Sequence, residues 1–204
     1  MKKESVVSYY PTTAISDGQS GNGFAAGAIH PIRSDLTLVG RAVTVQLPIG
    51  ENGAVLQAIK LAKGGDVLVI NAKGDRHRAV AGDFVISMMQ KVGIAGLVVD
   101  GVIRDIEAVR ALKFPVFCKG TSAVAGVKNG GGKVNIPIAL GEAVVHPGDY
   151  IFGDVDGIMV VPANDIDEVL EKTKRKMASD KAREETVLAT KKAVLAYLDK
   201  ELKK

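Results

Sequence analysis

The sequence predicts an α/β fold built as one domain, and two observations support this prediction. Short aliphatic runs typical of buried strands alternate with segments in which apolar residues recur every three or four positions, as on the inner face of a helix. The 204 residues are 47% hydrophobic but only 4% aromatic, with no Trp, so the core must consist of Val, Ile, Leu and Ala, as around buried parallel strands. This length suits one well-buried domain with a helical appendage, and not two full domains.

The first third of the chain contains a helix, a strand and a second helix. Residues 12–27 are rich in Ser, Asn, Asp and Gly, so we expect a short helix that gives way to a flexible turn. Residues 38–46 alternate apolar with small or polar residues, as a half-buried strand does, and residues 54–61 carry one apolar stripe and form a helix. Glu51 and Asn52 precede this helix and either face a site or only begin the helix.

A strand, a helix and a second strand in the middle of the chain form a βαβ unit. The strands are the aliphatic runs at residues 67–70 and 94–99, each followed by polar residues or Gly. Residues 83–91 between them are predicted to form an amphipathic helix, with Asp83 as its N-cap and Gly93 as its stop. The apolar residues that recur there at helical spacing are Phe84, Val85, Met88, Met89 and Val92.

The dimensions of this unit bring its charged ends together. A helix of about nine residues spans ~14 Å and six strand residues return ~20 Å, so the start of the helix meets the end of the second strand. Asp83, Arg104 and Asp105 should therefore surround one crevice at the carboxyl ends of the strands, where open α/β sheets bind ligands. The free N–H groups there are those of Phe84 and Val85.

Two interpretations of this crevice are open from the residues alone. The helix N-terminus and Arg104 both favour a small carboxylate or phosphate, and Asp105 offers a hard oxygen to a divalent ion. Alternatively, Asp83 is only a helix cap, and Arg104 and Asp105 are only an exposed pair in a turn.

The chain beyond Asp105 first continues the same pattern and then turns to short strands. Residues 106–112 and 114–118 are expected to form a helix and a strand. The glycine-rich residues 120–132 lack the order of a phosphate-binding P-loop, so we expect a mobile loop that binds no nucleotide. Four short strands follow, separated by Pro-Gly and Asp-Gly turns, at residues 134–138, 143–146, 150–154 and 157–162.

Residues 164–204 form a strongly charged helical segment. Its apolar stripe is too narrow to belong to a core along its whole length. We therefore expect this segment to pack on a neighbouring subunit.

Charge, cysteine content and hydropathy exclude several classes of protein. The net charge of +4 and the pI near 9.1 owe much to the Lys-rich ends, Lys2-Lys3 and Lys203-Lys204, which indicates solvated surface and not a nucleic-acid footprint. The single Cys118 excludes an intrachain disulfide and a multi-cysteine zinc site, and suits a reducing cytoplasm. No run of about 18 apolar residues and no signal-peptide pattern occurs, so we expect a soluble cytoplasmic protein without a membrane span.

Several motifs, spread over most of the chain, together resemble one known family. They are SDG near the start, VGRAVTV, GGDVLVI, LKFPVF and GDYIFGDVDGIMVVP, and in the middle Gly82-Asp83 followed after twenty residues by Arg104-Asp105. With these motifs the sequence resembles the RraA-like proteins, which include 4-hydroxy-4-methyl-2-oxoglutarate aldolases and the regulator of ribonuclease activity A. The spaced Asp and Arg-Asp pattern is the specific part, and the other motifs mark the fold.

The resemblance implies a fold, an assembly and a chemistry. The fold would be a swivelling-type β/β/α sandwich over residues 1–163, with a helical extension over residues 164–204 and without a Rossmann strand order. The assembly would be a homotrimer or hexamer with active sites between subunits. The chemistry would be a Mg²⁺- or Mn²⁺-dependent class II aldolase or decarboxylase reaction on pyruvyl dicarboxylic acids, which cleaves 4-hydroxy-4-methyl-2-oxoglutarate to pyruvate or decarboxylates oxaloacetate through a pyruvate enolate.

The resemblance also implies roles for individual residues. Asp105 would bind the metal ion, which chelates the 2-keto and carboxylate oxygens of the substrate. Arg104 would oppose the charge that develops on the substrate oxygen, and Asp83 would position a water that exchanges protons with the enolate carbon. Further contacts to the pyruvyl group would come from Gly82 and from the N–H groups of Phe84 and Val85.

Three details stay open at this stage. Many relatives carry an acid where this chain has Ala108, which leaves the exact substrate undecided. The family also brings an acidic residue from a neighbouring subunit towards the metal, for which Glu184 and Glu185 are candidates unless they are solvated helix residues. The basic loop at residues 71–78 either helps to neutralise an anion or is surface, and His77 lacks the spaced partners of a metal cluster.

The alternative function is that of a non-catalytic regulator that binds a ribonuclease or another protein partner. The presence of both Asp83 and Asp105 argues against it, because a binding module needs no metal carboxylate. A quinone methyltransferase is not supported, since the sequence lacks a glycine-rich Rossmann loop for S-adenosylmethionine.

Overall fold

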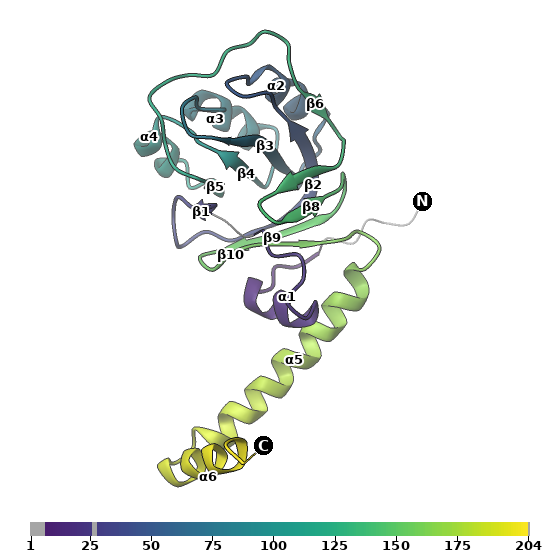
Figure 1. Ribbon diagram of the computed structural model, residues 1–204, viewed down its shortest axis with the longest axis vertical. Helices are drawn as coiled ribbons and strands as arrows, with labels where there is room; N and C mark the ends of the chain where they lie inside the picture. The colour runs from purple at the N-terminus through teal and green to yellow at the C-terminus, as the bar shows by residue number, and fades with distance from the viewer. Residues whose placement is uncertain (1–6, 26–27, 204) are drawn as a thin grey trace.

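A mixed β-sheet crosses the centre of the molecule (Figure 1) in this computed structural model, which describes residues 7–25 and 28–203. Its strands follow the order β1-β5-β4-β3-β2-β9-β10, with β6 paired to β2 beside this path. The bounds are β1 His30–Pro31, β2 Leu38–Gln46, β3 Val67–Asp75, β4 Gly96–Gly101, β5 Val116–Cys118, β6 Lys133–Val134, β9 Tyr150–Asp154 and β10 Gly157–Val161. A second, two-stranded sheet pairs β7 (Ile138–Leu140) with β8 (Ala143–Val145).

The predicted βαβ unit is confirmed. Strands β3 and β4 run parallel, with Val67 opposite Gly96, and α3 (Asp83–Lys91) connects them. Strands β2 and β5 add to this pair in parallel, and α4 (Ile106–Ala111) connects β4 to β5, so the unit is repeated as expected. Helix α2 (Gly53–Leu61) lies between β2 and β3 in the chain.

Both faces of the central strands are covered. On one face, Leu68 and Ile70 of β3 pack into a cluster with Ile86 and Met89 of α3 and with residues of α2 and α4. On the other face, alternate residues of the same strands pack against β7 and β8. Burial on both faces explains the continuous aliphatic runs. The prediction of a half-buried strand at residues 38–46 is therefore corrected, because Thr44 of β2 is as buried as its neighbours.

The apolar face predicted for α3 is wrong in part. Ile86 and Met89, three positions apart, are the buried residues of this helix, whereas Phe84 is 73% exposed. Phe84 instead lines the pocket at the N-terminus of the helix. The N-cap is Gly82, one residue before the predicted Asp83, and Gly93 ends the segment with a φ of +84°.

The strand expected at residues 134–138 is also divided. Residues 133–134 pair with β2 as β6, and β7 begins only at Ile138. Residues 26 and 27 of the first predicted turn, and the terminal Lys2, Lys3 and Lys204, lie outside the described residues.

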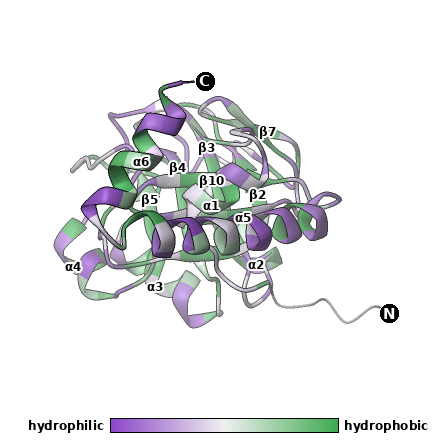
Figure 2. Ribbon diagram, turned by 90° about the horizontal axis from the view of Figure 1, so that it is seen from below, coloured by the Kyte–Doolittle hydropathy of each residue, from purple (hydrophilic) through white to green (hydrophobic). Residues whose placement is uncertain are grey.

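The C-terminal segment is helical as predicted. Helix α5 (Ile166–Val187) packs beside α1 (Thr12–Gly18) at its start and then leads away from the sheet, and α6 (Lys191–Glu201) follows it (Figure 1). Figure 2 shows hydrophilic and hydrophobic stretches mixed along both helices. Only Ile166, Val169 and Thr173 of α5 are buried, and packing of this segment on a neighbouring subunit stays a prediction. Within residues 7–25 and 28–203, no helix has the length and apolarity to cross a membrane.

A buried carboxylate ties the N-terminal segment to β9. Asp154 accepts hydrogen bonds from Thr12 N (2.8 Å), Thr12 Oγ1 (2.6 Å) and Tyr9 Oη (2.8 Å), and from Asp156 N (2.9 Å). Burial alone would raise the pKa of Asp154, but these hydrogen bonds outweigh it and hold the pKa below the ordinary 3.8.

We expect Asp154→Asn to lower the free energy of unfolding by about 2 kcal/mol at pH 7, because charge-assisted hydrogen bonds are lost. Since the pKa is lowered in the folded state, this stabilisation is complete above pH 3.8 and disappears as the pH falls through the folded value. Urea unfolding of both proteins across this range measures the difference. The exposed Asp156→Asn serves as control, and a difference that persists unchanged at the lowest pH would contradict the assignment.

Candidate functional site

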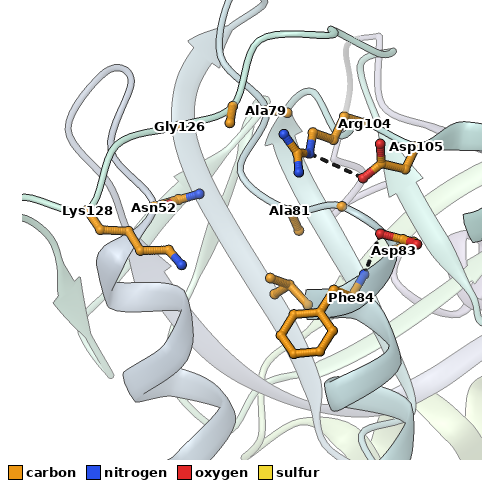
Figure 3. A pocket seen from close by; sticks show the side chains of 12 residues that line it. Asn52, Ala79, Ala81, Asp83, Phe84, Arg104, Asp105, Gly126 and Lys128 are labelled. Atoms are coloured by element: carbon orange, nitrogen blue, oxygen red, sulfur yellow. Dashed lines mark hydrogen bonds and ion pairs between the residues drawn. The ribbon is translucent and has the colours of Figure 1, made fainter.

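A pocket of about 240 Å³ opens at the N-terminus of α3, beside the carboxyl end of β4 (Figure 3). Its lining includes every residue that the sequence placed in the site: Gly82, Asp83, Phe84, Val85, Arg104 and Asp105. The volume suits a small organic acid better than a nucleotide or another large cofactor. The two ends of the βαβ unit therefore meet, as the lengths of its helix and strand predict.

Arg104 and Asp105 are held by the backbone that leads from β4 into α4. The N–H group of Arg104 donates to the carbonyl of Ala81 at 3.0 Å, which joins the segment after β4 to the residue before Gly82. Asp105 is the N-cap of α4 and has a left-handed backbone, with φ 59° and ψ 41°. Such a conformation costs a non-glycine residue about 1 kcal/mol or more, and it recurs at functional sites.

The charges of the pocket lie on two sides. Arg104 Nε is 3.2 Å from Asp105 Oδ2, and their side chains are 43% and 38% exposed, so both remain accessible to a ligand. Figure 3 shows Asp83 and Asp105 on one side of the pocket and Lys128 with Asn52 across from them. The pocket thus offers two carboxylates and two cationic groups.

One of the two predicted N–H donors is occupied. Asp83 Oδ1 accepts a hydrogen bond from the N–H group of Phe84 at 2.7 Å. Contrary to the expectation, this N–H group is therefore not free to bind a substrate carboxylate. Asp83 belongs to the first turn, where its carboxylate lies beside the helix N–H groups it neutralises. Val85 also belongs to this turn, where the first N–H groups lack partners within the helix.

Two polar side chains of the pocket lie outside the predicted set of site residues. Asn52 lines it from the start of α2, and its Oδ1 atom is buried without a hydrogen-bond partner among the described residues, so a ligand could use it. Lys128 comes from the loop at residues 120–132. No spacing in the sequence connects Lys128 to the other residues, whereas Asn52 was left open as a residue that could face a site.

The glycine-rich loop forms one wall of the pocket. Ala79 N donates to Val124 O at 2.8 Å, Gly126 N donates to Ala79 O at 2.9 Å, and Val127 N donates to Gly50 O at 2.8 Å. These bonds hold the loop against the segments before α2 and α3. The sequence predicted a mobile loop that binds no nucleotide. It gave no sign that this loop lies beside the pocket.

The basic loop at residues 71–78 does not line the pocket. Asp75 accepts hydrogen bonds from Gly50 N at 2.9 Å and His77 N at 2.8 Å, and Arg78 donates to the carbonyl of Ala125 at 2.9 Å. This loop supports the pocket wall from outside. The cations that face the pocket are Arg104 and Lys128 instead.

The donor set fits a hydrated Mg²⁺ or Mn²⁺ ion. Over residues 7–25 and 28–203, no three His, Cys, Asp or Glu side chains gather as a ready metal cage, which excludes a closed zinc-type site there. Magnesium, however, is usually held by one or two carboxylates together with water and substrate oxygens, and Mn²⁺ accepts the same ligands. Asp105, with Asp83 in the same pocket, provides such a set.

The site leaves no room for a side chain at position 82. A Cβ atom on Gly82 would overlap the Asp105 carboxylate and lie 3.0 Å from both Cγ and Nε of Arg104. We expect Gly82→Ala to displace these two side chains and, for the reaction that the family resemblance implies, to lower kcat/KM by about 10²-fold while the protein stays folded, since small misplacements at reacting groups have effects of this size. The assay is pyruvate release together with thermal unfolding. Gly64→Ala is the matched control, because its Cβ would meet only the Gly93 carbonyl at 3.9 Å, and equal activities of the two variants would refute this role.

Fold and pocket together define an α/β protein with a pocket at the carboxyl end of a parallel βαβ unit. This pocket contains one arginine, one lysine and two aspartates. Residues 12–160 match the profile of the RraA-like family, described as Aldolase/RraA, and the chain belongs to this family. A protein of Halalkalibacterium halodurans, whose name assigns it provisionally as a 4-hydroxy-4-methyl-2-oxoglutarate aldolase, is 49% identical over 190 residues, which cover 93% of this chain and 90% of that protein.

Solved structures agree with this assignment. RraAS2 of Streptomyces coelicolor, described as an unusual member of the RNase ES inhibitor RraA protein family, is 28% identical with a TM-score of 0.73, over 84% of this chain and 91% of that one. A Geobacillus kaustophilus structure described as an S-adenosylmethionine:2-dimethylmenaquinone methyltransferase is 26% identical with a TM-score of 0.70, over 75% and 95% of the two chains. The predicted family and fold class are therefore confirmed.

Proposed function

We propose that this protein is a divalent-metal-dependent class II aldolase or decarboxylase that acts on pyruvyl dicarboxylic acids. The observation that carries the proposal is the convergence of Asp83, Arg104 and Asp105 in one small pocket. The relative named as an aldolase, 49% identical over 93% of this chain, supports a lyase function. Substrates of this class are 4-hydroxy-4-methyl-2-oxoglutarate, which would be cleaved to pyruvate, and oxaloacetate, which would lose its terminal carboxylate.

Each residue has a task that its position permits. Arg104 directs its guanidinium to the 2-keto oxygen and opposes the negative charge that develops there as the enolate forms. Asp83 holds a water molecule that returns a proton to the enolate carbon. Asp105 would hold the divalent ion, which when bound supplies Lewis-acid polarisation of the 2-keto group. The pyruvyl carboxylate lies against the backbone of Gly82 and the N–H group of Val85.

The opposite side of the pocket suits the second carboxylate of the substrate. Lys128 provides a positive charge there, and the side-chain N–H₂ group of Asn52 provides a donor for a carboxylate oxygen, since the Oδ1 atom of this amide can only accept. A pocket with one cation at each side favours a dicarboxylic acid over pyruvate itself.

Assembly and location belong to the same proposal. We infer a homotrimer or hexamer in which a neighbouring subunit contributes an acidic side chain to the pocket. Glu184 and Glu185 of the same chain are exposed near the end of α5, the helix that leads away from the body (Figure 1), so they would serve another subunit's pocket. The buried, free thiol of Cys118 accords with a reducing cytoplasm.

A purified sample assayed with Mg²⁺ or Mn²⁺ tests the function. We expect metal-dependent release of pyruvate from 4-hydroxy-4-methyl-2-oxoglutarate, from oxaloacetate, or from both, and loss of this release after chelation. Decay of oxaloacetate at the rate of metal alone, with no cleavage of the 4-hydroxy acid, would refute the proposal.

The second candidate is a protein that binds and regulates a ribonuclease, and the likeness to RraAS2 favours it. Recovery of a ribonuclease with the protein, equal for wild type and Asp105→Ala, would support this function. The methyltransferase description of the Geobacillus structure is not carried over, because the sequence has no glycine-rich Rossmann loop.

A further inference from the structure

A buried carboxylate joins the start of α2 to the loop that carries Lys128. Glu51 is only 6% exposed. Its Oε1 atom accepts hydrogen bonds from Asn52 N at 3.0 Å and Gly53 N at 2.7 Å, and its Oε2 atom accepts one from Asn129 N at 2.9 Å. One side chain thus connects segments that lie 78 positions apart.

These bonds hold the backbone on both sides of Lys128. Before it, Val127 N donates to Gly50 O at 2.8 Å, and Val127 O accepts from Asn52 N at 2.9 Å. After it, Asn129 is bound by Glu51. The Lys128 side chain itself remains exposed in the pocket. The same carboxylate contacts the backbone of Asn52, the other residue on this side of the pocket.

The charge of Glu51 is suited to this position. The N–H group of Gly53 is the main cause that lowers the pKa of this carboxyl, the N–H groups of Asn129, Asn52 and Gly131 add to it, and burial opposes them. The group is therefore ionised at neutral pH and accepts on both oxygens. A glutamine of the same size would present an N–H₂ group to one set of these donors and lose that contact.

We propose that Glu51 is a positioning residue that holds Lys128 and Asn52 where they bind the second carboxylate of the substrate. This inference rests on the proposed function, because it names the part of the pocket that selects a dicarboxylic acid. Glu51 touches no substrate and acts through the wall formed by residues 127–131.

Ligand affinities of single and double variants test this role without any measurement of turnover. We expect Glu51→Gln to raise the Kd of 2-oxoglutarate, a stable 2-oxo dicarboxylate, by about tenfold, with the Kd of pyruvate changed less than about twofold. Lys128→Ala should give a similar change, and the loss in the double variant should be smaller than the product of the two single losses, since Glu51 acts partly through Lys128. Isothermal titration with Mg²⁺ present gives these values, and the exposed Glu142→Gln is the control.

Trypsin gives a second readout that depends on neither binding nor activity. Cleavage after Lys128 should be at least about threefold faster in Glu51→Gln than in wild type, because loss of a clamp populates open conformations of the loop. Cleavage after the exposed Lys191 should be unchanged. Pyruvate binding and thermal unfolding report whether the variant is folded, and for a misfolded variant Glu51→Asp replaces it in both experiments.

The outcomes separate this inference from the proposed function. An inactive wild type that still prefers 2-oxoglutarate to pyruvate in a manner dependent on Glu51 and Lys128 would refute the proposed reaction and support the positioning role. Equal losses for both ligands, additive effects in the double variant, or unchanged cleavage after Lys128 would each overturn the role of Glu51.

Discussion

Replacing Arg104 with lysine is expected to lower kcat by roughly 10²- to 10³-fold, with a smaller change in KM, because a lysine keeps the charge but loses the planar array of donors. The guanidinium already uses Nε towards Asp105 Oδ2 at 3.2 Å, so its other nitrogens remain for the substrate. A lysine ammonium that pairs with Asp105 cannot also reach the 2-keto oxygen in the same geometry. Steady-state pyruvate release measures kcat and KM separately.

The chain provides a matched control for this variant. Arg33 forms an exposed ion pair with Asp35 at 2.6 Å and does not line the pocket, so Arg33→Lys should leave turnover unchanged. If Arg104→Lys retained full kcat and only raised KM, Arg104 would bind substrate without stabilising charge in the transition state.

In the proposed reaction, asparagine at position 105 is expected to lower metal-dependent turnover by roughly 10²- to 10³-fold, because polarisation of the keto group by the ion would contribute several kcal/mol. The substitution keeps the size of the side chain and removes the charge that holds a divalent ion. We expect the affinity for Mn²⁺, measured by electron paramagnetic resonance without substrate, to fall as well. The loss of the partly exposed ion pair with Arg104 contributes little to stability, so the variant should fold.

Asp35→Asn is the corresponding control, since it removes the carboxylate of another exposed Arg–Asp pair. Turnover and Mn²⁺ affinity should both equal those of wild type. Wild-type Mn²⁺ binding in Asp105→Asn would show that Asp105 is not the metal ligand, whatever the effect on turnover.

The βαβ unit and three side chains of its site could be predicted because they depend on short stretches of chain. Aliphatic runs such as residues 67–70 specify buried strands, and the lengths of α3 and β4 determine that the helix start and the strand end meet. The local chemistry of the first turn was less predictable. The N-cap is Gly82 and Asp83 binds the N–H group of Phe84, while the Phe84 side chain is exposed in the pocket and does not join the core.

The sequence by itself determined the α/β class, the strand and helix order around the centre, and the meeting of Asp83 with Arg104 and Asp105. Periodicity and element length are properties of contiguous residues, which is why these features could be predicted. Only the tertiary structure decided the opposite wall of the pocket. Lys128 faces Asp105 because Glu51 and Asp75 arrange backbone segments that are distant in the chain, through hydrogen bonds that leave no periodic pattern in the sequence.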